Sequence, residues 1–233
     1  EELAEAATKW QAKGFNSLKM TVGNQALARR DEPRLLGDVI LEDANRVETV
    51  RMAAGPEAEL FIDANCSLDL YHARQLCQMI EPFRIEFFEE PVTQNDVRQL
   101  AELRSQTTIR LACGQNEGQA YRFRDMMIAG AVDIIQPNVA ITGGFTQCQK
   151  IAALANSFNI SVDNGGAWPF FNQHLQAGLS NGGLVEYHYS SVEVCKQLYI
   201  GLPEPKEGWL KMTNTPGLGF ELNIAALSHF EID

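Results

Sequence analysis

The stretch Glu59-Leu60-Phe61-Ile62-Asp63 decides the fold of this chain, because it is a short apolar run that ends on a carboxylate. Similar runs recur, and between them lie segments with apolar residues at helical spacing. The expected strands cover residues 15–22, 59–63, 83–88, 109–113, 132–136, 160–162 and 184–187. The expected helices cover residues 42–54, 68–80, 97–104, 120–129, 145–158 and 170–179, after a first helix that ends before Gly14. Strands that alternate with helices predict an α/β fold with a parallel sheet.

The spacing of the strand ends distinguishes a barrel from an open sheet. The positions that follow six expected strands are residues 63, 89, 115, 138, 163 and 186, so that neighbours are 23 to 26 residues apart. An open doubly wound sheet breaks such a period and usually begins on a glycine-rich phosphate loop, and neither feature is found. The spacing therefore favours a TIM-type (β/α)7β barrel. Because only seven strands are expected, we predict that a missing segment before residue 1, or a partner chain, supplies the first strand.

Two segments depart from this period. Residues 24–38 are expected to form a long loop on the face where the strands end, and after Tyr189 the alternation gives way to turn-rich sequence. We therefore expect a barrel domain over residues 1–190 and a closing segment packed on it over residues 191–233. Because an open parallel edge exposes unpaired backbone groups, we expect the chain expressed alone to be poorly soluble or to form homo-oligomers.

Composition and charge exclude several classes of protein. The 233 residues are 45% hydrophobic and 21% charged, which is typical of a folded domain, and the net charge of −11 disfavours binding to nucleic acid or to anionic membranes. No apolar run approaches the length of a membrane span, and the first residues do not resemble a signal peptide. The five scattered cysteines favour reduced thiols, mostly in the core, and a cytoplasmic location.

Polar residues at the strand ends are candidates for chemistry, because barrel enzymes place their active sites there. Asp63, Glu89 and Gln115 follow three consecutive strands and would present three oxygen ligands to one point, as Mg²⁺ accepts. A single carboxylate at such a position more often caps a helix or pairs with a lysine. Three at matched spacing make a Mg²⁺ site the better hypothesis.

Lys19 and Thr21 lie two residues apart on the first expected strand, so their side chains should share one face. A buried lysine beside a cation can have its pKa lowered into the range that suits proton transfer. The alternative, that Lys19 only neutralises Asp63 or Glu89, carries about equal weight.

Six motifs, in chain order, resemble those of the enolase superfamily, in the branch of mandelate racemase, muconate lactonizing enzyme and the acid-sugar dehydratases. They are the run from Gly14 to Gly23, Ile62-Asp63-Ala64-Asn65, Phe88-Glu89-Glu90-Pro91, Gln136-Pro137-Asn138, Gly143-Gly144 and Pro216-Gly217-Leu218-Gly219. The resemblance implies a (β/α)7β barrel, normally preceded by a capping domain, and a Mg²⁺ that stabilises an enediolate after proton abstraction beside a carboxylate.

The resemblance also implies roles for single residues. Asp63 and Glu89 match the first two metal ligands, and Lys19 matches the first lysine of a paired-lysine motif. Glu186 matches a carboxyl group on the last strand that contacts a substrate oxygen.

The chain departs from this pattern where the family carries its proton-transfer groups. Thr21 stands in place of the second lysine, and Gln115 stands in place of the third metal carboxylate. Asn138 replaces the aspartate of a histidine–aspartate dyad, and the histidine position falls on Asn164 or Gly165. Threonine is no base near neutral pH, and a glutamine ligand removes one negative charge from the metal site.

Three hypotheses follow. The first is a Mg²⁺-dependent enzyme that dehydrates, racemises or cycloisomerises a small hydroxy acid or acid sugar. Its candidate catalytic residues are Lys19, Asp163, Glu186 and His188, and its candidate substrate-binding residues are Thr21, Asn65, Asn138 and Asn164. The second is a catalytically impaired relative that binds a carboxylate ligand or serves a structural role.

The third hypothesis is an unrelated phosphate-binding barrel. It would need a glycine-rich loop after a late strand, whereas Gly182-Gly183 precedes the last expected strand. We rank it last.

Overall fold

The computed structural model describes residues 2–23 and 34–227 and divides the chain into two compact units. The first unit comprises Glu1–Cys113 and Asp125–Ile134, and the second comprises Gly114–Arg124 and Ile135–Asp233. In the described residues, strands β1 to β7 are parallel and follow one another in the sheet in chain order. The predicted α/β fold of TIM type is confirmed.

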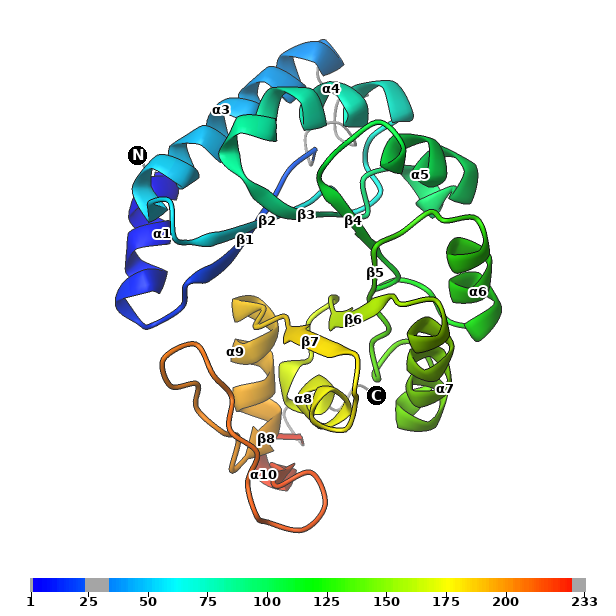
Figure 1. Cartoon of the computed structure of the whole chain (residues 1–233). Helices are drawn as coiled ribbons and strands as arrows, with labels where there is room; N and C mark the ends of the chain where they lie inside the picture. Colours follow the sequence, from blue (N-terminus) through cyan, green and yellow to red (C-terminus); the bar gives the residue numbers. More distant parts are fainter. Residues whose placement is uncertain (1, 24–33, 228–233) are drawn as a thin grey trace, which may run out of the picture. The chain divides into compact units, whose positions relative to one another are not determined.

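The first unit carries four complete strands and the helices that connect them (Figure 1). The strands are β1 (Ser17–Thr21), β2 (Glu59–Asp63), β3 (Ile85–Glu89) and β4 (Arg110–Cys113). The helices are α1 (Glu2–Ala12), α3 (Leu36–Ala54), α4 (Leu70–Ile80), α5 (Val97–Arg104) and the 3-10 turns η1 (Glu81–Phe83) and η2 (Thr93–Asn95). Helix α6 (Ala120–Ile128) ends in this unit, and β5 (Ile134–Ile135) begins in it.

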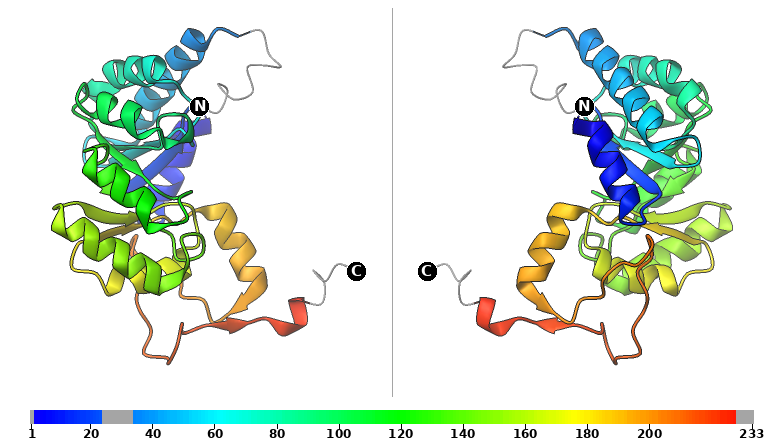
Figure 2. Two further views of the ribbon diagram at one scale, coloured as in Figure 1. Left: turned by 90° about the vertical axis from the view of Figure 1, so that its right-hand side faces the viewer. Right: turned by 90° about the vertical axis from the view of Figure 1, so that its left-hand side faces the viewer.

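Strands β2, β3 and β4 are mostly buried on both faces, which explains why they are rich in apolar residues. On one face Leu60, Ile62 and Phe88 are at most 2% exposed. Figure 2 shows helices α3 and α4 side by side along the strands. On the other face Phe61 and Phe87 pack ring to ring at 4.5 Å, in a cluster with Ala112 and Ile134.

The second unit contains the later strands and the last helices. They are β6 (Ser161–Asn164), β7 (Gly182–Val185), the short pair β8 (Tyr199–Ile200) and β9 (Glu221–Leu222), α7 (Gly144–Ser157), α8 (Pro169–Ala177), α9 (Tyr189–Leu198) and α10 (Ile224–Leu227). Its core includes Phe170, Val192 and Cys195, against which Tyr199 and Phe220 pack. Ring contacts join Tyr199 and Phe220 to Phe170 and Phe171 of α8.

Three expectations about the elements need correction. Helix α3 begins at Leu36, six residues before the predicted start, so the predicted 24–38 loop extends no further than residue 35, and residues 24–33 of it lie outside the described residues. Strand β7 covers Gly182–Val185, so the two glycines lie inside the strand and not before it. Helix α9 occupies a region that we expected to be turn-rich, and Val192 and Cys195 at helical spacing form its buried face.

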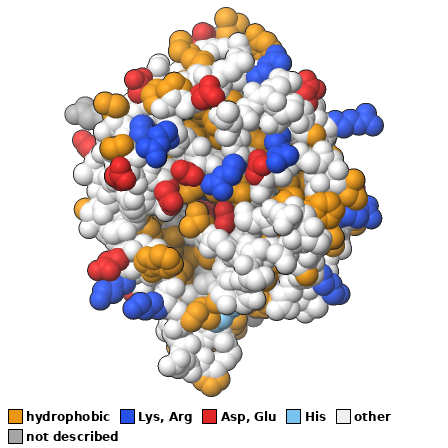
Figure 3. Space-filling view, viewed as in Figure 1, with side chains coloured by type: hydrophobic (Ala, Val, Ile, Leu, Met, Phe, Trp, Pro, Cys, Tyr) orange, Lys and Arg blue, Asp and Glu red, His pale blue; other side chains and the backbone are white. Residues whose placement is uncertain are grey.

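The surface carries mixed charges, and most of the cysteines lie in the core. Side chains of both charge signs are interspersed on the face shown in Figure 3. All five cysteines are free, and Cys77, Cys113, Cys148 and Cys195 are buried, as predicted. Within residues 2–23 and 34–227, every helix is too short or too polar to be a candidate membrane span.

Candidate functional site

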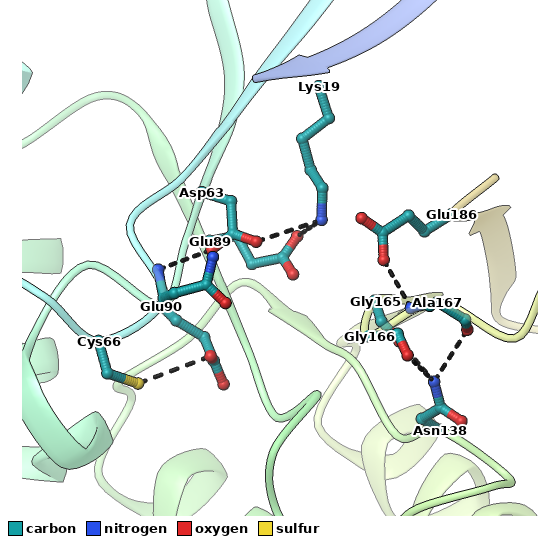
Figure 4. Close-up of polar contacts among 11 residues, drawn as sticks. Lys19, Asp63, Cys66, Glu89, Glu90, Asn138, Gly165, Gly166, Ala167 and Glu186 are labelled. Atoms are coloured by element: carbon teal, nitrogen blue, oxygen red, sulfur yellow. Dashed lines mark hydrogen bonds and ion pairs between the residues drawn. The ribbon is translucent and has the colours of Figure 1, made fainter. Parts of the chain in front are cut away.

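Three charged side chains meet at the carboxyl ends of the first unit's strands. Lys19 Nζ lies 2.9 Å from Glu89 Oε2 and 3.4 Å from Asp63 Oδ2 (Figure 4). Both carboxylates are buried, since the Glu89 side chain is 0% and the Asp63 side chain 6% exposed, whereas Lys19 is 18% exposed. The sequence predicted that Asp63 and Glu89 would converge together with Gln115. Lys19 forms the ion pairs that we weighed as one of its two roles.

Strand register explains why these residues meet. Thr21 is the partner of Asp63, and Asp63 is the partner of Glu89, so the two carboxylates occupy one level of the sheet. Lys19 lies one pleat earlier on the same strand face as Thr21, and its long side chain reaches up to the carboxylates. The exposed Thr21 stands at the end of β1.

A tight turn after β2 fixes Asp63. Its Oδ1 accepts a hydrogen bond of 2.8 Å from the backbone N–H of Asn65, while Oδ2 faces Lys19. Asn65 adopts a φ of 46°, a left-handed conformation that asparagine tolerates better than most residues. The backbone N–H of Ala64 donates to the carbonyl oxygen of Glu89, which joins this turn to the end of β3.

A third buried carboxylate, Glu90, follows Glu89 in the chain and was not among the predicted site residues. It is 0% exposed, and it accepts hydrogen bonds from Asn95 Nδ2 at 2.9 Å and from the Cys66 thiol at 3.5 Å. Glu90 therefore connects the loop after β2 with the loop after β3. The adjacent Pro91 and the acidic pair Glu89-Glu90 could have pointed to a turn, but one partner of Glu90, Cys66, comes from another loop.

The charge of Glu90 affects the thiol beside it. Burial, and then the charge of Glu90 and the hydrogen bond to it, raise the pKa of the Cys66 thiol to about 12. Burial is also the main reason that the pKa of Cys113 is raised, with a further contribution from Glu90. Both cysteines are thiols, not thiolates, near neutral pH.

In the second unit, Asn138 anchors the loop after β6. Its Nδ2 donates to the carbonyl oxygens of Gly165, Gly166 and Ala167 at 2.8, 3.0 and 3.0 Å, and its Oδ1 accepts from the backbone N–H of Ala140. The side chain is 0% exposed, and both ends of its amide are engaged by backbone groups. A role in substrate binding, as the sequence suggested, stays a prediction.

The loop held by Asn138 has an unusual backbone and binds a carboxylate. Gly166, Ala167 and Trp168 have φ values of 74°, 65° and 60°, so three consecutive residues are left-handed. The N–H of Ala167 donates to Glu186 Oε2 at 2.8 Å (Figure 4). The buried Gln115 packs against the same loop. The contact is close, since a Cβ placed on Gly166 would lie 3.2 Å from the Cβ of Gln115.

The remaining predicted residues contact the backbone of their own unit. Asp163 Oδ1 accepts from the N–H of Leu184 at 2.7 Å, and the neighbouring Asn164 donates to the carbonyl oxygen of Pro137. His188 is exposed and caps α9, where its Nδ1 accepts from the N–H of Ser191 at 3.5 Å. Catalytic roles for Asp163, Glu186 and His188 stay predictions.

The residues of the first unit fit a hard divalent cation. Asp63 and Glu89 offer two buried carboxylates that already share one cationic group, the ammonium of Lys19. Mg²⁺ is often held by one or two carboxylates together with water and substrate oxygens. Within the part of the chain that the structure describes, no cluster of three or more His, Cys, Asp or Glu residues could hold a metal ion. A third protein ligand from these described residues would therefore be of another type, and Gln115 in that role stays a prediction.

Comparisons with known proteins identify relatives of this chain. A D-galactonate dehydratase of Xanthomonas euvesicatoria pv. vesicatoria is 28% identical over 158 residues, which are 68% of this chain and 40% of that protein. The crystal structure of the 3,6-anhydro-D-galactonate cycloisomerase of Zobellia galactanivorans matches with a TM-score of 0.85 and 29% identity, over 97% of this chain and 62% of that one. The L-talarate dehydratase of Polaromonas sp. JS666, solved with Mg and L-glucarate, matches with a TM-score of 0.83 and 25% identity, over 97% and 58%.

These relatives are longer than this chain, which spans 40% of the D-galactonate dehydratase and about 60% of the two solved structures. The sequence profile of one family, described as enolase C-terminal domain-like, matches residues 2–226. The resemblance seen in the motifs is thereby confirmed. This chain belongs to the enolase C-terminal domain-like family.

Proposed function

We propose that this chain forms the barrel part of a Mg²⁺-dependent enzyme that acts on a small hydroxy acid or acid sugar. The reaction begins with removal of the proton next to the substrate carboxylate and leads to dehydration, racemisation or cycloisomerisation. The observation that carries the proposal is the contact of Lys19 with the buried pair Asp63 and Glu89. Relatives that act on acid sugars support the substrate class.

The residues of the first unit have separable tasks in this proposal. Asp63 and Glu89 would hold the cation, and the hydrogen bond from Asn65 fixes the orientation of Asp63. When bound, Mg²⁺ supplies a Lewis acid that stabilises negative charge on the substrate carboxylate. Lys19 is the one residue of the paired-lysine motif that keeps an ionisable group, so it either accepts the proton or binds the substrate carboxylate as a point charge.

The groups of the second unit bind and orient in this proposal. Glu186 is held by the N–H of Ala167, which leaves a carboxylate directed by the backbone and able to accept a hydrogen bond from a substrate hydroxyl. Asn138 shapes the loop that carries Ala167. Proton transfer by Asp163 or His188 is the alternative if Lys19 only binds.

A screen of sugar acids in the presence of Mg²⁺ tests the proposal. The purified protein should convert at least one acid sugar, detected by mass spectrometry as loss of water or by chromatography as an isomer. The variant Asp63→Asn/Glu89→Gln and the addition of a chelator should both abolish turnover. A complete lack of turnover, with Mg²⁺ bound, would contradict the proposal.

A catalytically impaired relative that binds a carboxylate is the second candidate. Two observations favour it: Thr21 stands where a base is expected, and the amide of Asn138 is engaged by backbone carbonyls. This candidate predicts binding of acid sugars without turnover.

We also propose a cytoplasmic location and a homo-oligomer, in which a further segment or a partner completes the barrel. Sedimentation would measure the oligomeric state.

A further inference from the structure

The side chain of Lys19 occupies the position between two buried carboxylates that the proposed function assigns to a metal ion. Its ammonium group is within 3.4 Å of one oxygen of Asp63 and of one oxygen of Glu89. Glu89 is completely buried, so water contributes little to the stability of its charge. The ammonium of Lys19 therefore offsets part of the negative charge of these two carboxylates.

A divalent cation that binds the same carboxylates would compete with Lys19 for them and would also be repelled by its charge. The two carboxylates that would hold the cation already accept hydrogen bonds from Lys19 Nζ, through Glu89 Oε2 and Asp63 Oδ2. The charge of the cation also repels the ammonium, and in a site with little water that repulsion is much stronger than in bulk solvent. The Lys19 ammonium in its present position therefore opposes binding of the cation.

We propose that Lys19 is an internal competitor of the metal ion. In this role it holds Asp63 and Glu89 together in the metal-free protein and lowers the affinity of the site for divalent cations. When the cation binds, the displaced amine becomes available to the substrate, so metal binding and exposure of Lys19 are coupled. The inference rests on the proposed function, since it takes Asp63 and Glu89 as the metal ligands.

Calorimetric titration with Mg²⁺ tests the competition directly. Lys19→Met keeps the length of the side chain and removes its charge, and it should bind Mg²⁺ at least about tenfold more tightly than the wild type. Lys19→Arg keeps the charge and should stay close to the wild type. Arg110→Met is the matched control, because it also removes one positive charge but breaks an exposed pair with Glu86. Its Mg²⁺ affinity should change less than about twofold.

Thermal denaturation gives a second readout. The substitution that tightens Mg²⁺ binding should lower the melting temperature of the metal-free protein. Without Mg²⁺, Lys19→Met should melt at a lower temperature than the wild type, because the buried Glu89 loses its cationic partner. At saturating Mg²⁺ the difference should disappear or reverse. A variant that stays less stable by the same amount at all Mg²⁺ concentrations would show that Lys19 stabilises the fold only, and would overturn the proposal.

A measurement on the wild type covers the case in which Lys19→Met does not fold. The nitrogen NMR signal of the Lys19 ammonium group, assigned by its loss in Lys19→Arg, should shift during a Mg²⁺ titration and follow the calorimetric binding curve. A signal that does not move while Mg²⁺ binds would overturn the proposal.

The outcomes separate this inference from the proposed function. Equal Mg²⁺ affinity in the wild type and Lys19→Met, together with turnover by the wild type, would overturn the competition alone. Tighter Mg²⁺ binding by Lys19→Met supports the competition even if the wild type converts no acid sugar. That lack of turnover would count against the proposed enzymatic function only. Absence of Mg²⁺ binding in both proteins would overturn both.

Discussion

The carboxylate of Asp163 accepts a hydrogen bond of 2.7 Å from the backbone N–H of Leu184, next to a residue that has no side chain. A Cβ placed on Gly183 would lie 2.0 Å from Asp163 Oδ1. The pairing of β6 with β7 also shifts register here, between Val162 and Asn164. Asp163 thus supplies an acceptor for a strand N–H at an irregular point of the sheet.

Gly183→Ala should therefore destabilise the protein by about 1–3 kcal/mol, because the new methyl group overlaps the Asp163 carboxylate. Chemical denaturation measures the change. Gly37→Ala is the control: nothing lies within 4 Å of its added Cβ, and in helix α3 the substitution should be neutral or stabilise by about 0.5–1 kcal/mol. Equal stability of Gly183→Ala and the wild type would refute the contact.

Asn138→Asp should destabilise the chain instead of restoring a catalytic aspartate. The new carboxylate cannot donate to the carbonyl oxygens of Gly165, Gly166 and Ala167, and the expected cost is about 1–3 kcal/mol. Asn223→Asp is a suitable control, since its amide donates to a single exposed carbonyl, that of Gln197. A fully stable Asn138→Asp variant with higher turnover would contradict this reasoning.

The Cys66 thiol should react slowly with iodoacetamide, because its pKa of about 12 leaves little thiolate at pH 8 or 9. Glu90→Gln removes a nearby negative charge, lowers this pKa, and should make alkylation at pH 9 faster.

The raised pKa of Cys66 also makes the stability of the protein depend on pH. The Cys66 thiol has a pKa of 9.0 in the unfolded chain and therefore loses its proton there at a lower pH than in the folded protein. Its contribution to the free energy of unfolding is therefore lost as the pH rises from about 9 to 12.

Gln115→Glu should bind Mg²⁺ more tightly, roughly tenfold, if residue 115 is a metal ligand, since each added negative charge strengthens attraction to a divalent cation. Calorimetry measures the affinity. Asn116→Asp adds the same charge at the neighbouring position and controls for a general electrostatic effect. No gain for Gln115→Glu over this control would exclude Gln115 from the metal site.

Lys19→Ala should abolish turnover if Lys19 is the base, because general base catalysis contributes about 10² to 10⁴ in rate. If Lys19 only binds the substrate carboxylate, the variant should raise KM and leave the pH profile of kcat unchanged. Thr21→Lys, at the end of the same strand, should preserve or increase turnover by restoring a lysine pair. Full activity of Lys19→Ala would exclude both roles.

Local patterns predicted the strands well, and the register then brought Asp63 beside Glu89 within reach of Lys19, because neighbouring parallel strands end at one edge. The sequence could not predict which polar residues the backbone would engage. Asp163 and His188 are ordinary candidates for catalysis in the sequence, but they bind a strand N–H and the first turn of a helix. Glu90 was missed because its partner Cys66 lies on another loop, which meets the loop of Glu90 only in the folded chain.

The left-handed loop from Gly166 to Trp168 has a consequence for the order of folding. Asn138, which holds its carbonyl oxygens, lies 27 residues before Gly165, and Glu186, which binds its N–H, lies 19 residues after Ala167. Neither contact can form until the chain on both sides has reached its place, and left-handed residues are unfavourable without such contacts. This loop should therefore acquire its structure late, after β6 and β7 have paired, and open first when the protein begins to unfold.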